Sequence, residues 1–589
     1  MTESIARERK LFLSNLIKSP AFLIRHSPSL AAVVANRYRP VLLQKVQDAH
    51  LVDKKRPPWL PHKCLNLSAT WDPAVLMKRI PFWEISLTGA DDVPRDIPVE
   101  SGALHDIEAY FAVHRWGRLL KFDARHDGKD TKDFLSRWLA SKADKSDPAW
   151  ETYSSCERIA NLLTWLSTVR PEDRMENIPK EIVSFLVDSA VWIFNRLEYY
   201  GETKTNNHFL NNARALVMVG SVLNSYQLFE TGLAIFRSML PRLIQPDGFL
   251  RERSSHYQLV ILKWLLDSLF FARSVNGDYQ DSISSLEEIT LRMSRAASLI
   301  CDTKGYLLSC IGDISPDTTP YDSARLLALL HPERWPLNKK EDRPGRKSMD
   351  DWHRLDSRKS TIIANFPQGE YPSGFPTHGH CDITGFVWLY GGRQILCDSG
   401  RYRYTKDDVS AFQRSAMGHN VPVVDGIAPV CENMVSSNWV PTPYGKAFLN
   451  ITMPDEHSLT MSHDGFARGG KVKKHSREIV LFDRALHVKD SFDGNGTAEI
   501  CFFWHFAPGF EPVSEGSLTV RDNNLRIHVA GVNNADAPYG IEWFKGTDTG
   551  GWYSEEYGRC IPINTLVLKW NAVLPFEIKT SFRVEICAA

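Results

Sequence analysis

The chain has 589 residues, 43% of them hydrophobic and 24% charged, so it is long enough for two folded domains and has no compositional sign of disorder. Its 70 basic and 70 acidic residues cancel, which argues against charge-driven binding to nucleic acid or to an anionic membrane. No stretch reaches the roughly 20 apolar residues that span a bilayer. The start of the chain lacks a recognisable signal peptide, so we expect a cytoplasmic protein, with a periplasmic or secreted location by another route as the alternative.

The first half of the chain is expected to be helical, because its apolar residues recur at the roughly 3.6-residue spacing of a helix. In the segment 181–200 they form a broad stripe, and Gly201 then supplies a C-terminal stop. Similar runs occupy residues 211–223, 229–243, 258–275 and 281–301. Long helices joined by short links predict an array of antiparallel helical hairpins.

The pattern changes after residues 336–351, a charged stretch with two prolines and a glycine that we interpret as an exposed linker. Short runs rich in β-branched and aromatic residues follow at 360–366, 386–397, 478–492 and 498–506. The pair Gly391-Gly392 predicts a two-residue hairpin turn. Many strands without intervening helices predict a large antiparallel β-sandwich.

These patterns together predict a multidomain α+β protein. We expect a partly helical N-terminal extension over residues 1–95, a helical domain over 96–345 and an antiparallel β-sandwich over 346–589. Ten scattered cysteines without any CxxC pair are typical of free thiols in a reducing compartment.

Two polar segments open predicted helices. The first is Thr205-Asn206-Asn207-His208, where a capping role explains one asparagine but not the whole group. The second is the segment 251–257, Arg-Glu-Arg-Ser-Ser-His-Tyr, where a capping serine within a solvated charge cluster is the ordinary explanation. Both segments are candidate parts of a functional site.

The densest polar segment is Thr377-His378-Gly379-His380-Cys381-Asp382. In an extended chain, residues two apart share a face, so His378, His380 and Asp382 would project together. Asp398 and His419 would complete a His/Asp/His zinc site with His380. A simple turn at Gly391-Gly392 would set Asp398 at the wrong parity relative to His380, so a β-bulge is needed to bring both side chains to one face.

These segments, in this order, resemble the heparinase II/III-like polysaccharide lyases. The matching pieces are Asn207-His208, Arg253-Ser254 with Tyr257, the HGHCD segment at 378–382, Asp398-Ser399-Gly400 and the stretch 412–426, FQRSAMGHNVPVVDG. Trp150, Tyr153-Ser154 and the segment 158–161 extend the likeness upstream.

The resemblance implies an incomplete (α/α) toroid followed by a β-sandwich, with the active site between the two domains. It implies catalytic roles for Asn207, His208, Tyr257 and His378, and a metal site at His380, Asp398 and His419, with no organic cofactor. The residues expected to contact substrate are Arg253, His256, Tyr402, Tyr404, Arg414 and His505. The chain departs from the family in having Gln258 after Tyr257, where many relatives have histidine, and in lacking an acid one turn after His208.

The implied reaction is β-elimination on an acidic polysaccharide, such as a glycosaminoglycan or an exopolysaccharide, which leaves a 4,5-unsaturated uronide. Asn207 would hydrogen-bond the carboxylate on which negative charge develops. Tyr257 would act as acid, or as both acid and base, and His208 or His378 would assist or serve as base. Tyr402 or Tyr404 is an alternative acid.

Two other functions remain open from the sequence. A glycoside hydrolase needs two carboxylic acids roughly 5 to 10 Å apart, for which Glu252 and Asp382 are the nearest candidates. A non-catalytic glycan-binding protein of an exopolysaccharide pathway would use the same surface without turnover. A nucleic-acid partner is not expected, and the oligomeric state is undetermined.

Overall fold

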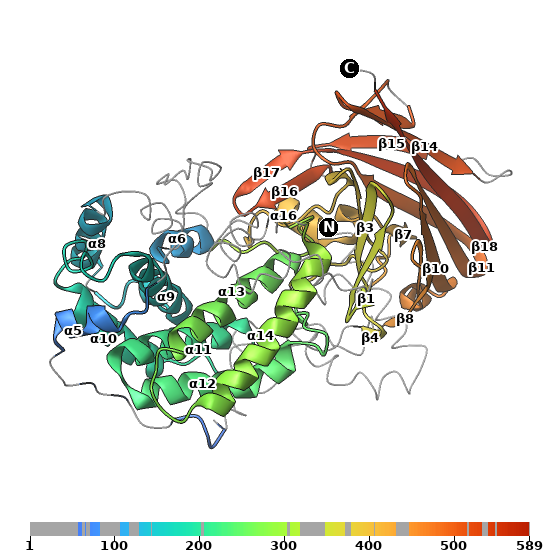
Figure 1. The fold of residues 1–589 in the computed structure, drawn as a ribbon. Helices are drawn as coiled ribbons and strands as arrows, with labels where there is room; N and C mark the ends of the chain where they lie inside the picture. Colours follow the sequence, from blue (N-terminus) through green and yellow to red (C-terminus); the bar gives the residue numbers. More distant parts are fainter. Residues whose placement is uncertain are drawn as a thin grey trace, which may run out of the picture.

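The computed structural model shows a helical half followed by a sheet half, side by side (Figure 1). The described residues are 57–61, 65, 67, 71–82, 107–116, 129–142, 144–201, 205–302, 307–317, 348–371, 378–405, 407–430, 447–514, 517–532, 540–547 and 550–587. Most of the predicted extension 1–95 and of the linker 336–351 lies outside them. Within the described residues, no helix is long and apolar enough to cross a membrane.

The helical half contains each of the five helices that the apolar spacing predicts, with ends moved by a few residues. The helices are α5 (Pro73–Arg79), α6 (Ile107–His114), α8 (Lys129–Ser141), η4 (Pro148–Trp150), α9 (Thr152–Thr168), α10 (Ile182–Phe194), α11 (Asn207–Leu223), α12 (Tyr226–Leu243), α13 (Ser255–Ala272) and α14 (Gln280–Ile300). The predicted array of long helices is therefore confirmed, whereas its closure into a toroid stays a prediction.

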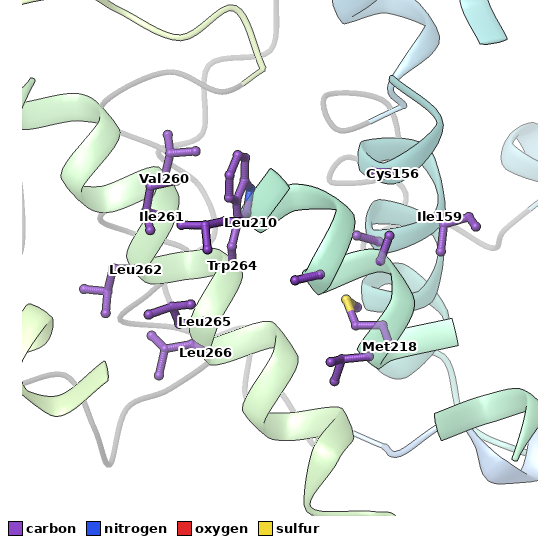
Figure 2. Packing of buried hydrophobic residues seen from close by; sticks show 14 of the residues in the cluster. Cys156, Ile159, Leu210, Met218, Val260, Ile261, Leu262, Trp264, Leu265 and Leu266 are labelled. Carbon is purple, nitrogen blue, oxygen red and sulfur yellow. The ribbon is translucent and has the colours of Figure 1, made fainter. Parts of the chain in front are cut away.

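Helix α11 is the central helix of this half. Nearly all of its side chains are buried, and Figure 2 shows Leu210 and Met218 of α11 between residues of α9 and of α13. One buried cation also joins the three helices, because Arg214 of α11 donates to Glu157 of α9 at 2.9 Å and to Asp267 of α13 at 2.8 Å. These bonds tie the middle of α11 to α9 and to the C-terminal third of α13.

The sheet half is built from antiparallel strands, as predicted. They form a five-stranded sheet in the order β1-β2-β3-β5-β6, an eleven-stranded sheet whose main path runs β12-β13-β14-β18-β11-β10-β9-β8-β4, and the pair β16-β17. The strands are β1 (Ser348–Met349), β2 (Trp352–Asp356), β3 (Ser360–Asn365), β4 (Gly369–Tyr371), β5 (Val387–Tyr390), β6 (Arg393–Leu396), β7 (Pro422–Val424), β8 (Ala447–Asp455), β9 (Ser458–His463), β10 (Val472–Leu481), β11 (Ala485–His505), β12 (Glu511–Pro512), β13 (Thr519–Arg521), β14 (Leu525–Val532), β15 (Gly540–Lys545), β16 (Trp552–Glu556), β17 (Arg559–Pro562) and β18 (Asn564–Ile586). Three short helices lie among them, namely α16 (Asp408–Arg414), η7 (Ala416–Gly418) and η8 (Gly465–Gly469).

The two large sheets share one hydrophobic core. Strands β11 and β18 alternate between buried and exposed side chains, which is the pattern of strands with one face covered. Across the interface, the Trp388 ring of β5 lies 6.1 Å from the Phe582 ring of β18, measured between centroids. The packing is that of a β-sandwich.

The hairpin at Gly391-Gly392 forms as predicted, and it contains a bulge. Both glycines have positive φ angles, +62° and +80°, which the tight turn requires. Tyr390 pairs with Arg393, but the register shifts so that Trp388 pairs with Leu396. The additional residue in β6 shifts the residues after it by one position relative to β5, and a turn at residues 382–385 separates His380 from β5, so that strand alternation alone does not set the relation of Asp398 to His380.

The run 478–492 is two strands rather than one. Strand β10 ends at Leu481, β11 begins at Ala485, and the Phe482 N–H donates to the Ala485 carbonyl in the turn between them. The two residues of this turn, Asp483 and Arg484, are charged, but neither glycine nor proline marks it in the sequence.

Candidate active site

Two helix starts bring the predicted catalytic residues of the helical half together. Asn206 caps α11 by accepting from the His208 N–H at 3.1 Å, and Ser254 caps α13 by accepting from the Tyr257 N–H at 3.1 Å. The ordinary capping explanation therefore accounts for Asn206 and Ser254. Asn207, His208 and Tyr257 are left in the first turns of the two helices with no capping function.

The segment 307–317 passes between the helical half and the sheet half. The Asp313 N–H donates to the His378 carbonyl at 2.8 Å, and the His378 N–H donates to the Glu252 carbonyl at 2.8 Å. Gly312 has φ +80°, and a Cβ on it would lie 2.7 Å from the His378 carbonyl oxygen. This close approach needs glycine, and it fixes His378 beside the start of α13.

His378 meets both helix starts. Its Nε2 lies 3.3 Å from Nδ2 of Asn207, and its ring stacks on the Tyr257 ring with centroids 3.8 Å apart and planes 10° apart. The Tyr257 hydroxyl lies 2.7 Å from the Tyr404 hydroxyl. The structure thus brings together Asn207, Tyr257, His378 and Tyr404 from the set predicted from sequence.

Asp313 anchors this group and was not predicted. Its carboxylate lies 3.0 Å from His378 Nδ1 and 2.9 Å from His380 Nε2, and it accepts two hydrogen bonds from Arg401 Nη1 at 3.0 and 2.9 Å. Burial raises the pKa of Asp313, but Arg401 and the two histidines outweigh it and hold the pKa well below its usual range. A permanently charged carboxylate directs the Nδ1–H of His378 toward itself and leaves Nε2 as the acceptor.

The Tyr257 hydroxyl keeps its proton in the free protein. The Tyr404 hydroxyl donates to the Ile314 carbonyl at 3.0 Å, so the proton between the two tyrosines belongs to Tyr257. Burial raises the pKa of Tyr257 well above its usual value, and the carboxylates of Asp317 and Asp313 raise it further. Tyr257 is therefore suited to give a proton rather than to take one in the resting state.

His208 stands at the other edge of the group, next to a carboxylate that sequence reasoning missed. Its Nδ1 lies 3.0 Å from Oε1 of Glu198, and its ring centroid lies 4.6 Å from that of Tyr153. Asn212 Nδ2 donates to the other oxygen of Glu198 at 2.9 Å. The acid absent one turn after His208 is thus supplied from the loop that precedes α11.

The predicted metal ligands also converge. One ligand atom from each of His380, Asp398 and His419 lies within 4.8 Å of the others, and all three residues are buried. His380 Nδ1 has no hydrogen-bond partner in the described residues, while His419 Nδ1 lies 2.8 Å from Asp398. Two imidazoles and one carboxylate suit zinc, so the donor set fits the expected ion.

Other residues expected to contact substrate have structural partners instead. Arg253 donates to Asn365 at 2.7 Å and lies 3.4 Å from Asp382, and Tyr402 donates to Asp407 at 2.8 Å. His256 accepts from the Ser315 N–H at 3.0 Å and is fully buried.

His505 lies in the core of the sheet half, whereas Arg414 is partly buried and lies close enough to Asp313 and Tyr404 to interact with their charges. His505 is fully buried with Nδ1 2.9 Å from Thr565, and burial, with the nearby His419, lowers its pKa to about 3. The Arg414 carbonyl accepts from the Cys381 N–H at 3.1 Å, and burial lowers the pKa of its guanidinium. His256 and His505 are fully buried, and the contact of His256, His505 and Arg414 with substrate stays a prediction.

Asp313 and Glu198 were missed for related reasons. Each contacts a histidine that is not its neighbour in sequence, and Asp313 lies in a segment without a periodic pattern. Asp313 is 65 residues from His378, and Glu198 is 10 residues from His208. Only one feature of the sequence pointed to Glu198. The acid that some members of the family have one turn after His208 is absent here, which left this histidine without a carboxylate partner.

Comparison with known proteins identifies the sheet half. Residues 343–582 match the family model described as Heparinase II/III-like, C-terminal. A comparison with curated proteins gave no match.

Solved structures extend the likeness to nearly the whole chain. Heparinase III has a TM-score of 0.57 at 14% identity, covering 92% of this chain and 89% of that chain. The heparan sulfate lyase HepC from Pedobacter heparinus has a TM-score of 0.52 at 16% identity, covering 96% and 91%. The heparinase III BT4657 gene product has a TM-score of 0.53 at 15% identity, covering 95% and 91%. At these identities the likeness shows the fold. The predicted resemblance is confirmed: the sheet half matches the Heparinase II/III-like, C-terminal family model, and the chain as a whole has the fold of solved heparinases and heparan sulfate lyases.

Proposed function

We propose that the protein is a polysaccharide lyase that cleaves a uronic-acid-containing glycan by β-elimination and leaves a 4,5-unsaturated uronide. The observation that carries the proposal is the contact of His378 with both Asn207 and Tyr257. These three residues supply an amide donor, an imidazole and a phenol at one place. Proton abstraction beside a carboxylate needs this set, whereas binding alone does not.

The carboxylate of the uronate must be neutralised while the C5 proton leaves. The Asn207 amide donates a hydrogen bond to the carboxylate oxygen on which charge develops, and His208 faces the same substrate group from the neighbouring position of α11. Preorganised donors aimed at developing charge are worth about 3 to 4 kcal/mol of transition-state free energy.

Proton transfer is assigned to His378 and Tyr257. His378 Nε2 takes the C5 proton, because Asp313 occupies the Nδ1 side of the ring. The C5–H electron pair forms the C4–C5 double bond, the C4–O bond breaks, and the leaving oxygen takes the Tyr257 proton. The stacked rings place base and acid on one side of the sugar, where His378 can return its proton to Tyr257 afterwards.

Zinc fits the buried group of His380, Asp398 and His419, which would hold it. When bound, the ion supplies a fixed positive charge and fixes its ligands in place. His380 would then present its other nitrogen to Asp313 in a single orientation, which steadies the carboxylate that directs His378.

The test is absorbance of the conjugated alkene when the purified protein is mixed with a panel of uronate glycans. We expect the Tyr257→Phe variant to lose about 10²- to 10⁴-fold in rate, because the acid is removed while the stacked ring remains. Tyr226→Phe is the matched control, since Tyr226 is 69% exposed on α12.

Two outcomes would contradict the proposal. Chain cleavage without alkene absorbance would favour hydrolysis, although Asp382, one of the two acids considered for that reaction, is already ion-paired with Arg253. Binding of a glycan without any cleavage would favour a non-catalytic binding protein.

A further inference from the structure

His208 and Glu198 form a histidine–carboxylate pair that is separate from the pair made by His378 and Asp313. The His208 side chain is 43% exposed, whereas Glu198 beneath it is 9% exposed. The carboxylate therefore meets only the Nδ1 edge of the ring, 3.0 Å away. The other edge, with Nε2, lies on the exposed side of His208.

Glu198 is held rigidly in this position by Asn212. The Asn212 amide nitrogen donates to Oε2 of Glu198 at 2.9 Å, and its amide oxygen accepts from the Glu198 backbone N–H at 2.8 Å. Oε1 is left for His208. Because Asn212 lies one turn after His208 on α11, the same helix presents the histidine and fixes its carboxylate.

We propose that Glu198 is a positioning residue that holds His208 with Nδ1–H on the carboxylate and turns Nε2–H toward the substrate. His208 then binds the uronate carboxylate as a cation through a charge-assisted hydrogen bond. This role rests on the proposed lyase function for its ligand. It differs from that of His378, which must be neutral to accept the C5 proton.

The charged surroundings of His208 favour the cation. The groups that act on it are the carboxylates of Glu198, Glu151, Glu108 and Glu252, the guanidinium of Arg115 and the hydroxyl-bearing ring of Tyr153. Arg115 is itself neutralised by Asp317 at 2.7 Å. Desolvation lowers the pKa of His208, but the hydrogen bond and charge of Glu198 outweigh it and the pKa is raised.

The direct test is the titration of His208 by NMR in the full-length protein without substrate, with His208→Asn used to assign its signal. In Glu198→Gln, the single amide oxygen cannot accept hydrogen bonds in both places, from His208 Nδ1 and from Asn212 Nδ2, and the negative charge is lost. We expect the pKa of His208 to fall in this variant. Glu181→Gln is the matched control, since Glu181 is exposed and its side chain makes no capping hydrogen bond to α10.

Kinetics of alkene formation supply the second measurement. With a uronate glycan that the wild type cleaves, Glu198→Gln is expected to lose about tenfold to a hundredfold in kcat/KM, mostly through KM. The alkaline limb of its pH profile moves to lower pH, a change that a merely structural defect would not produce.

The outcomes separate this role from the lyase function. An unchanged His208 pKa in Glu198→Gln overturns the role of Glu198, whatever the wild type cleaves. A lowered pKa in a protein that cleaves no uronate glycan supports the pairing but contradicts the lyase proposal. If Glu198→Gln fails to fold, Glu198→Asp keeps the charge but draws the carboxylate away from Nδ1, and a kcat/KM for alkene formation equal to that of the wild type would then overturn the role.

Discussion

Two buried clusters in this protein have the same composition, one aspartate, one arginine and two histidines, yet they differ in how completely their atoms are bonded. The junction cluster, between the two halves, comprises Asp313, Arg401, His378 and His380, and the core cluster, inside the sandwich, comprises Asp490, Arg477, His475 and His463.

The core cluster is a closed chain of hydrogen bonds. His463 Nδ1 accepts from the Gly465 N–H at 3.1 Å, its Nε2 lies 3.0 Å from His475 Nδ1, and His475 Nε2 lies 2.7 Å from Asp490. Arg477 donates to both oxygens of Asp490. None of the four side chains is exposed by more than 1%, so no atom is available for a ligand.

The junction cluster is open at two atoms. The His378 side chain is 22% exposed, and its Nε2 lies 3.3 Å from the Asn207 amide nitrogen and 3.5 Å from the Glu252 carboxylate. His380 Nδ1 faces the predicted metal group and has no hydrogen-bond partner in the described residues. The same residue types therefore form a structural cluster when all their polar atoms are hydrogen-bonded, and a candidate functional site when some of those atoms remain available to a ligand.

The largest expected effect is on activity at the junction. Asp313→Asn should lower kcat/KM by about 10²- to 10⁴-fold, because His378 loses the charged partner that sets its tautomer. Alkene formation by folded protein measures this effect. The corresponding change in the core, Asp490→Asn, should leave kcat/KM of the folded protein unchanged. Equal losses in both variants would contradict the assignment of the junction cluster, rather than the core cluster, to function.

The next effect is on stability in the core. Asp490→Asn should lower the free energy of unfolding by about 3 to 5 kcal/mol, because it leaves the buried Arg477 without its counter-charge. Urea unfolding followed by tryptophan fluorescence measures this loss. A change below about 1 kcal/mol would show that the cluster relaxes when its charge is removed.

Metal binding is expected at the group that shares His380 with the junction cluster, and not at the core cluster. We expect the protein to take up zinc, and zinc at a hundredfold excess over Kd to stabilise the fold by about 3 kcal/mol. Metal analysis and the thermal midpoint measure both effects, and His419→Ala should abolish them. His528→Ala, an exposed histidine on β14, is the control. Full zinc content in His419→Ala would place the ion elsewhere.

The smallest effect is a pH dependence that originates in the core cluster. Burial lowers the pKa of His463 well below its usual value, and the neighbouring His475, Arg468 and Arg477 lower it further. The unfolded chain then binds a proton near pH 6.5 while the folded chain does not, so this contribution to stability is complete above about pH 6.5 and is lost as the pH falls. The free energy of unfolding of His463→Gln should vary less between about pH 7 and 5 than that of the wild type, and parallel curves would contradict the assignment.

The fold could be predicted largely from periodicity, because helix and strand spacing are local properties. The five long helices and the Gly391-Gly392 turn are confirmed for that reason. The bulge opposite Trp388 could be predicted only as a requirement of the metal site, since no residue type marks it. The turn at 482–485 was missed because its two central residues, Asp483 and Arg484, include no glycine or proline.

The site could be predicted where residues departed from a local rule. Asn207 and His208 stood out because Asn206 alone suffices as the cap of α11. Asp313 and Glu198 could not be found in this way, because their roles depend on contacts that form only when distant segments pack. The sequence also could not show that His463 and His475 are structural, because nothing in it distinguishes a fully hydrogen-bonded histidine cluster from one with atoms available to a ligand.

Mass spectrometry of the products formed from a uronate glycan in ¹⁸O-labelled water distinguishes elimination from hydrolysis. Elimination breaks the C4–O bond without adding solvent oxygen, so the new non-reducing end should be lighter by one water molecule than a hydrolysis product and should carry no label. Products with the full mass of hydrolysis and one ¹⁸O atom would contradict the account.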